Sequence, residues 1–130
     1  MNKQINIFWF RRDLRLEDNR GLWLALKHGL PVLPIFIFDT NILATLSNPA
    51  DPRVHFIYQS LNQLNEELKA FQSAIKIHHG QPEEVFRQLL VDFEIKNVFF
   101  NKDYEPYAIK RDRKIKELCS FHGVNVISAK

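Results

Sequence analysis

Runs of β-branched and aromatic residues alternate along this chain with stretches in which apolar residues recur every three or four positions. The runs are typical of strands buried on both faces, and the stretches are typical of amphipathic helices. Strands are predicted at residues 5–10, 32–38, 75–78, 98–100 and 124–127. The third run alternates between apolar and polar residues, so we expect it to lie near an edge of the sheet.

Four helices are predicted between these strands. Asp18 and Asn19 are suitable N-caps for the first helix, which would end at Gly29, and proline begins each of the other three. Residues 41–50 are expected to form an irregular loop. The apolar residues expected to face the core are Leu22, Leu24, Ala25 and Leu26 in the first helix, Val54, Ile57, Leu61, Leu64, Leu68 and Phe71 in the second, Val85, Phe86, Leu89, Leu90 and Phe93 in the third, and Ala108, Ile115, Leu118 and Cys119 in the fourth.

Strict alternation of strands and helices predicts an α/β fold with right-handed crossovers. We expect a Rossmann-like three-layer sandwich over residues 1–130, in which a five-stranded parallel sheet of order 3-2-1-4-5 carries helices on both faces. Ligands of such sheets lie beyond the carboxyl ends of the strands, where the strand order reverses. The residues expected at that point are Phe10, Arg11, Arg12, Asn101, Lys102 and Asp103, with Phe38 and Asp39 nearby.

The first strand-to-helix turn, residues 9–19 (W-F-R-R-D-L-R-L-E-D-N), contains no glycine. Dinucleotide and triphosphate sites need glycine there for tight turns and for close approach of the backbone to phosphate, so both are disfavoured. Three arginines occupy the turn instead. Arg11, Arg12 and Arg15 either bind an anion or pair with Asp13, Glu17 and Asp18, and the mixed signs favour pairing.

The composition is that of an ordinary globular protein, with 45% hydrophobic and 25% charged residues and no apolar run long enough for a membrane span. Most of the eleven phenylalanines are expected in the core. A net charge of +3 permits contact with nucleic acid but does not form a concentrated basic stripe. The start of the chain lacks a signal-peptide pattern and cysteine occurs once, so we expect a cytoplasmic protein.

Few residues outside the arginine-rich turn suggest chemistry of their own. His78 and His79 lack the neighbours of a metal site and are interpreted as a solvated loop pair. Cys119 lies on the apolar side of a helix, where an inert thiol is expected. Lys110, Arg111, Arg113, Lys114 and Lys116 are expected to face outward as a solvated or docking surface. We therefore predict no catalytic residue and no metal ligand.

Four segments in order resemble the signatures of the DNA photolyase and cryptochrome family. The first is the quoted turn 9–19, and the third is Gly80-x-Pro82 followed by Val85. The second and fourth segments are Arg53-x-x-Phe56-x-x-x-Ser60-Leu61-x-x-Leu64 and Asn101-x-Asp103-x-Glu105-Pro106-Tyr107-Ala108, the latter followed by Arg111-Asp112. The resemblance covers nearly the whole chain.

The resemblance implies the amino-terminal antenna domain of a deoxyribodipyrimidine photolyase. In that family a helical FAD-binding domain, which this chain does not contain, uses light to split pyrimidine dimers in damaged DNA. A chromophore in the cleft between the two domains, methenyltetrahydrofolate, a deazaflavin or a flavin, harvests light for FAD. The residues that the resemblance assigns to chromophore contact are Phe38, Arg53, Asp103 and Glu105, with Arg11 and Lys102 as weaker candidates.

Folate-binding relatives carry an Asn-Glu pair shortly after the position of Glu105, whereas this chain has Tyr107 and Ala108. That departure argues against folate and leaves a deazaflavin, a flavin or no antenna open. Because half of the cleft comes from the other domain, residues 1–130 alone are expected to hold no chromophore and to repair no DNA. The same motifs also occur in cryptochrome signalling proteins, and a free-standing small-molecule-binding module is the third alternative.

Overall fold

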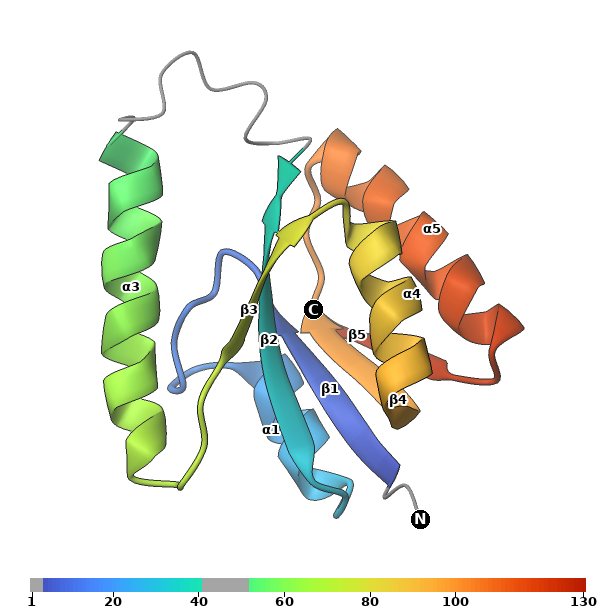
Figure 1. The fold of residues 1–130 in the computed structure, drawn as a ribbon, viewed down its shortest axis with the longest axis horizontal. Coiled ribbons are helices and arrows are strands. Elements are labelled where there is room, and N and C mark those ends of the chain that lie inside the picture. The colour runs from blue at the N-terminus through green and yellow to red at the C-terminus, as the bar shows by residue number, and fades with distance from the viewer. Residues whose placement is uncertain (1–3, 41–51) are drawn as a thin grey trace.

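The computed structural model describes residues 4–40 and 52–130, so the loop predicted at 41–50 lies outside the described residues. Five parallel strands form one sheet in the order β3-β2-β1-β4-β5 (Figure 1). The strands are β1 (Gln4–Phe10), β2 (Val32–Asp39), β3 (Lys76–Gly80), β4 (Glu94–Asn101) and β5 (Asn125–Ala129). The predicted fold class and strand order are confirmed, and β3 lies at an edge as expected.

Helices cover both faces of this sheet. On one face lie α1 (Arg20–Lys27) and α3 (Pro52–Lys69), and on the other lie α4 (Pro82–Asp92) and α5 (Pro106–Phe121) (Figure 1). Because successive side chains of a strand point to opposite faces, β1 supplies Phe8 and Phe10 to the first layer and Ile7 and Trp9 to the second. None of the helices in the described part is both long and apolar enough to cross a membrane.

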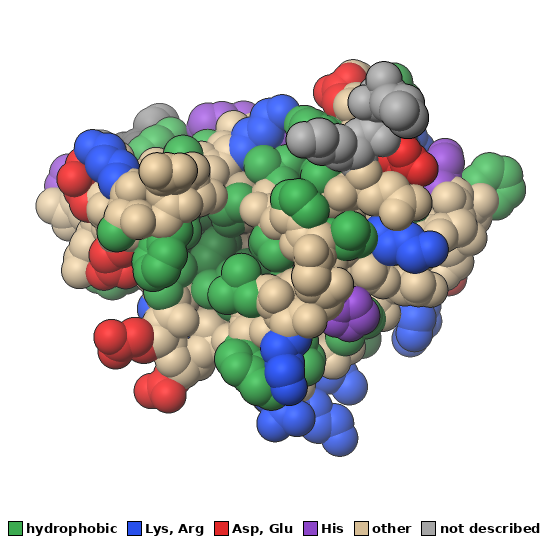
Figure 2. All heavy atoms as spheres, turned by 90° about the horizontal axis from the view of Figure 1, so that it is seen from below, with side chains coloured by type: hydrophobic (Ala, Val, Ile, Leu, Met, Phe, Trp, Pro, Cys, Tyr) green, Lys and Arg blue, Asp and Glu red, His purple; other side chains and the backbone are tan. Residues whose placement is uncertain are grey.

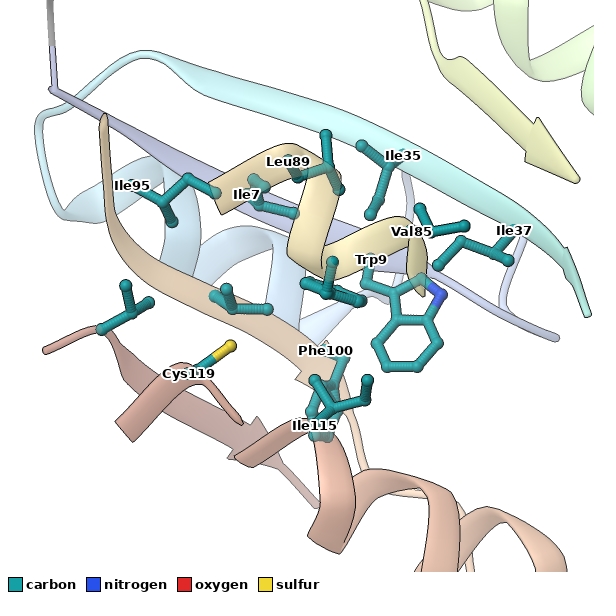
Figure 3. Packing of buried hydrophobic residues seen from close by; sticks show 13 residues of the cluster. Ile7, Trp9, Ile35, Ile37, Val85, Leu89, Ile95, Phe100, Ile115 and Cys119 are labelled. Atoms are coloured by element: carbon teal, nitrogen blue, oxygen red, sulfur yellow. The ribbon is translucent and has the colours of Figure 1, made fainter. Parts of the chain in front are cut away.

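Trp9 lies at the centre of the core on the α4 and α5 side. Figure 3 shows its indole among Ile37, Val85 and Phe100. Its ring centroid is 5.1 Å from that of Phe86 and 5.7 Å from that of Phe100, both in edge-to-face geometry. Such pairs add about 0.5–1.5 kcal/mol each to the free energy gained by burial. The last buried residues of β1 are therefore held firmly where the strand ends.

Two residues predicted to face the core are exposed. Leu26 is 62% exposed because it lies on the outer side of the short helix α1, whereas Leu22 and Ala25 are buried and Leu24 packs partly against the same core. Phe71 is 71% exposed because α3 ends at Lys69 and the chain turns away, with Gln72 in the left-handed region at φ 55°. The apolar period of α3 thus continues in the sequence past the end of the helix. Most phenylalanines are nevertheless buried, as predicted: Phe8, Phe10, Phe36, Phe38, Phe86, Phe99 and Phe100.

The amino ends of the strands form the opposite side of the molecule. Figure 2 views that side and shows hydrophobic side chains gathered around a hollow. A groove of about 780 Å³ also runs between α3 and the turn that precedes α1, and Leu14, Leu16, Leu64 and Phe71 are among its lining residues.

Candidate functional site

A pocket opens at the carboxyl ends of β1 and β2, beside the segment that connects β4 to α5. The chain leaves β1 toward one side of the sheet and leaves β4 toward the other, which is the arrangement that creates a crevice. The cavity has a volume of about 570 Å³, within the usual range for small-molecule sites. Four of the six residues assigned to chromophore contact line it: Arg11, Phe38, Asp103 and Glu105. Three further residues expected at or near the switch point also line it, namely Phe10, Arg12 and Asp39.

Phe38 provides an aromatic wall whose position is fixed by its neighbours. Its ring stacks on Tyr58 of α3 at 4.7 Å and on His79 of β3 at 4.8 Å, with interplanar angles of 30° and 13°. The Tyr58 Oη and His79 Nε2 atoms lie 3.3 Å apart and close this group. A flat ligand ring in the pocket would therefore meet a rigid aromatic surface rather than a mobile side chain.

The interpretation of His78 and His79 as a solvated loop pair is wrong. Both residues belong to β3, and His79 stacks on Phe38. His78 Nε2 is buried without a hydrogen-bond partner. Burial, and to a lesser degree the charges of Lys76 and His79, lower the pKa of His78. The strand predicted at 75–78 extends to Gly80 in the structure, so it carries both histidines at the edge of the sheet.

Arg11 lies under the pocket with its side chain only 7% exposed. Its guanidinium donates to the Asp112 carboxylate of α5 and to the backbone carbonyl of Asn101 at the end of β4. The guanidinium carbon also lies 4.3 Å from the centroid of the Phe100 ring. Burial lowers the pKa of Arg11, whereas the hydrogen bond and the charge of Asp112 raise it. Arg11 thus ties three segments together beneath the site.

Ion pairing of the turn arginines was predicted correctly, but the partners were wrong. Arg11 pairs with Asp112, which lies on α5, and the Nε atom of Arg12 lies 3.5 Å from Asp103. Arg15 donates to the backbone carbonyl of Asp18 at 3.3 Å. Asp13 accepts the backbone N–H of Arg11 at 2.9 Å rather than a guanidinium. The predicted pairs were local in sequence, whereas two of the observed ones join the turn to the segment after β4.

Arg111 was expected on the outer face of α5, and this expectation is also wrong. Its side chain is only 10% exposed and lines the pocket, with its guanidinium carbon 4.9 Å from the centroid of the Trp9 ring. Trp9 therefore lies next to the guanidinium groups of both Arg11 and Arg111. The Nε atom of Arg111 donates to Asp112 at 3.2 Å.

Tyr107 and Asp39 link the two sides of the site. Asp39 was expected near the switch point, whereas Tyr107 was not expected to contribute to the site. The Tyr107 hydroxyl donates to the buried Asp39 carboxylate at 2.6 Å. Their signal was present in the sequence, because Tyr107 and Arg111 are four residues apart on one helix and Asp39 immediately follows an apolar strand. Helical spacing alone would have placed Tyr107 beside Arg111.

The remaining two sequence candidates lie outside the pocket lining. Lys102 lines a smaller neighbouring hollow together with Arg12 and Asp103. Arg53 is exposed near the start of α3 and is not among the described residues that line the main pocket. A role of either residue in ligand contact stays a prediction.

The amino terminus of α1 is closed by side chains. Asn19 is the N-cap and accepts the Leu22 backbone N–H at 3.1 Å, so Asp18, the other suggested cap, does not serve this role. Asn101 at the end of β4 accepts the Gly21 N–H at 2.8 Å and donates to Asn19 and Asp13. The helix end that binds phosphate in dinucleotide-binding folds is thus occupied by an asparagine.

Gly21 is required by this arrangement. A Cβ atom at that position would lie 2.8 Å from Asn101 Oδ1 and 2.9 Å from the Phe8 ring. The glycine thus allows a side chain, rather than a phosphate, to approach the helix.

Metal chemistry has no visible basis in residues 4–40 and 52–130. No group of three or more His, Cys, Asp or Glu side chains there is arranged to hold a metal ion. Cys119, buried in the core, has its pKa raised to about 11 by burial and is therefore a poor nucleophile at neutral pH. The site is suited to binding and orienting a ligand.

The fold and the site together define a parallel α/β domain with a pocket at the switch point of the sheet. The family model described as DNA photolyase matches residues 6–130. The chain therefore belongs to the DNA photolyase family, which includes cryptochromes, and corresponds to the amino-terminal α/β domain of its members.

Two relatives and one solved structure illustrate the match. The chain is 34% identical to deoxyribodipyrimidine photo-lyase of Halobacterium salinarum over 92% of this chain and 26% of the relative. It is also 34% identical to cryptochrome-2 of Gallus gallus, over 94% of this chain and 21% of the relative. An archaeal photolyase from Sulfolobus tokodaii, solved with two FAD molecules that implied a novel light-harvesting cofactor, has a TM-score of 0.83 at 34% identity, over 96% of this chain and 29% of that one.

The chain thus spans between a fifth and a third of the length of these proteins.

Proposed function

We propose that this chain is the light-harvesting domain of a deoxyribodipyrimidine photolyase and holds an antenna chromophore in the pocket at the carboxyl edge of the sheet. The carrying observation is the pocket itself, because its aromatic wall at Phe38 and its charged rim match the needs of a flat, polar-edged chromophore. The chromophore passes its excitation to FAD in the helical domain of the protein, and reduced FAD then splits pyrimidine dimers in DNA.

The residues of this chain would bind and orient the chromophore without taking part in bond making. Phe38, which is held in place by Tyr58 and His79, forms part of the pocket wall, while Asp103 and Glu105 offer carboxylates in the pocket lining. Arg11 supports the floor through Asp112 rather than through a free donor. The Tyr107–Asp39 hydrogen bond holds the first turn of α5 against the end of β2.

Repair is tested with the protein as its gene encodes it. The purified protein is reduced and illuminated with DNA that contains pyrimidine dimers, and we expect the dimers to disappear in a light-dependent manner. Failure to repair any dimer would contradict the photolyase proposal. The cryptochrome alternative, which has the same 34% identity in its support through the Gallus gallus protein, would then take its place.

Light harvesting is tested with a substitution in the pocket wall. Phe38→Leu keeps an apolar side chain but removes the stacking ring, so we expect loss of the antenna chromophore and of repair at the wavelengths that it absorbs. Repair driven by light that FAD absorbs directly should persist. Phe121→Leu is the matched control, since Phe121 lies exposed at the far end of α5. Equal chromophore content in both variants would contradict a role of this pocket.

A further inference from the structure

We propose that the chromophore bound by this domain carries a phosphate group, and that a second pocket between α4 and α5 binds this phosphate. The second pocket has a volume of about 210 Å³ and shares Tyr107 and Arg111 with the main pocket. A ligand whose ring occupies the main pocket can therefore extend a substituent past these two residues. The inference rests on the proposed function for the ring and adds the chemical class of the substituent.

Cationic side chains predominate in the second pocket. Lys110, Arg111 and Lys114 line it from α5, and Glu83 is the acidic residue in its described lining. Glu83 lies 3.8 Å from Lys114 and 3.5 Å from Arg87, so its charge is already compensated. A phosphate carries roughly two negative charges near neutral pH and several acceptor oxygens, which suits such a surface.

Arg111 supplies the observation that points to a missing partner. A guanidinium has five N–H donors. Its Nε atom donates to Asp112, whereas Nη1 lies 4.0 Å from Asp39, beyond hydrogen-bond distance, and Nη2 is buried without any hydrogen-bond partner. Leaving buried donors unpaired costs about 1–3 kcal/mol per group. A ligand acceptor at the junction of the two pockets would remove this cost after a small rotation of the guanidinium.

The amino terminus of α4 contributes a second set of donors. Its N-cap residue Gln81 makes no side-chain capping hydrogen bond, and Gln81, Pro82 and Glu83 line the second pocket. The first backbone N–H groups of a helix have no acceptor within the helix, and the helix dipole favours an anion there. The uncapped first turn of α4 and Arg111 thus line the same small pocket.

The test compares two flavins that differ only in phosphate. Flavin mononucleotide and riboflavin are titrated by equilibrium dialysis into the protein as its gene encodes it, with its own FAD left in place. We expect flavin mononucleotide to bind at least tenfold more tightly, and this advantage should shrink as ionic strength rises, since salt screens the phosphate contacts. Equal affinity for both flavins would agree with a flavin ring in the main pocket but would contradict a phosphate site in the second pocket.

Matched variants assign the effect to the second pocket. Lys110→Ala combined with Lys114→Ala should abolish most of the advantage of flavin mononucleotide. Arg113→Ala combined with Lys116→Ala removes the same charge from exposed positions of the same helix outside the pocket and should preserve the advantage. Arg111→Lys keeps the charge but loses the paired donors, so it should also reduce the advantage. Equal losses in both double variants would overturn the assignment.

Dialysis with radiolabelled inorganic phosphate separates this inference from the proposed function. If neither flavin binds but phosphate binds and is lost on Lys110→Ala with Lys114→Ala, the phosphate site stands and the main pocket is not a flavin site. If riboflavin binds and flavin mononucleotide binds no more tightly, the main pocket holds the flavin ring and the phosphate site is overturned. If no flavin and no phosphate binds, both the flavin ring site and the phosphate site are overturned, and the Phe38→Leu experiment remains the test of light harvesting.

Discussion

The amino termini of α1 and α4 lie at the same edge of the same sheet, yet the first is closed and the second is open. Asn19 caps α1 and Asn101 accepts its Gly21 N–H, so the end is filled by amide side chains. At α4 no side chain caps the helix, and Arg111 with unpaired donors lies in the adjoining pocket. The helix terminus that binds phosphate in dinucleotide-binding folds, that of α1, is therefore filled by side chains. The groups suited to an anion lie instead at the amino terminus of α4.

Arg11 joins these two regions, because it donates to Asn101 on the closed side and to Asp112 on the side of α5. Asp112→Ala should lower the free energy of unfolding by about 3–5 kcal/mol, since it leaves a buried guanidinium without its carboxylate. Urea unfolding of the 130-residue chain measures this loss.

The exposed acid Glu117 on the same helix provides the control, and Glu117→Ala should change the unfolding free energy by less than about 0.5 kcal/mol. Arg11→Met combined with Asp112→Leu should recover part of the lost stability, because it removes the Arg11 charge together with its carboxylate, while Arg111 still loses its acceptor. A loss in Asp112→Ala no larger than in Glu117→Ala would show that the pair does not hold the regions together.

The closed terminus can be opened by Asn101→Ala. This change removes the acceptor of the Gly21 N–H and the donors to Asp13 and Asn19, and should cost about 2–3 kcal/mol of unfolding free energy. Asn125→Ala, on the exposed neighbouring strand, removes a single hydrogen bond of 3.3 Å and should cost less than about 1 kcal/mol. Similar values for both variants, measured by urea unfolding, would argue against a specific closure.

Substitutions of two glycines test whether close packing closes the amino terminus of α1. Gly21 lies in the first turn of this helix, and Gly29 follows its last turn. Gly21→Ala places a Cβ within 2.9 Å of Asn101 and Phe8 and should cost about 1–3 kcal/mol. Gly29→Ala meets no atom within 4 Å, but φ is +80° there, so it should cost about 1–2 kcal/mol.

Asparagine distinguishes the two causes, because it tolerates left-handed backbone but needs more room. In thermal unfolding, Gly29→Asn should be milder than Gly29→Ala, whereas Gly21→Asn should be worse than Gly21→Ala. The same order at both positions would contradict the steric explanation for Gly21.

The smallest expected effect is the pH dependence of stability that His78 contributes. His78 lies in β3, the strand that precedes the uncapped amino terminus of α4. The pKa of His78 is lowered in the folded chain. As the pH falls below about 6.5, the unfolded chain therefore binds a proton at His78 more readily than the folded chain does. The stability contributed by neutral His78 is present above about pH 6.5 and is lost as pH falls through the lower folded pKa. Urea midpoints should therefore fall from pH 7.5 to pH 5.5, and less so in His78→Gln.

His55→Gln, at an exposed position of α3, is the control and should keep the full pH slope. An unchanged slope in His78→Gln would show that burial of this imidazole does not affect stability.

The layers and strand order followed from the sequence because buried parallel strands leave long apolar runs and right-handed crossovers restrict their order. The strand predicted at 98–100 begins at Glu94 in the structure. Its first half alternates exposed Glu94 and Lys96 with buried Ile95, so the apolar run marked only the fully buried part. The starts of α3, α4 and α5 were predicted from their first residue, proline. The end of α3 was not predicted, because the apolar residue Phe71 continues the helical spacing just beyond Lys69.

The sequence predicted that the site lies at the carboxyl edge of the sheet, but it did not predict which side chains pair there. Arg11 and Asp112 are separated by 101 positions, and no local pattern indicates that they meet. Arg111 belongs to a run of basic residues that reads as a solvated face, yet it packs beside Trp9 because α5 crosses over the end of β1. Side-chain pairing at a sheet edge depends on how helices from different crossovers converge, which periodicity does not encode.

Trp9, enclosed by two guanidinium groups and lining the main pocket, gives the domain an internal optical signal. Its emission should be blue-shifted and shielded from acrylamide, whereas Trp23, which is 54% exposed beside Lys27, should emit farther to the red and be quenched readily. A near-ultraviolet absorber in the pocket would take up excitation from Trp9 before Trp23. The indole that anchors the central strand thus also reports whether the pocket is filled.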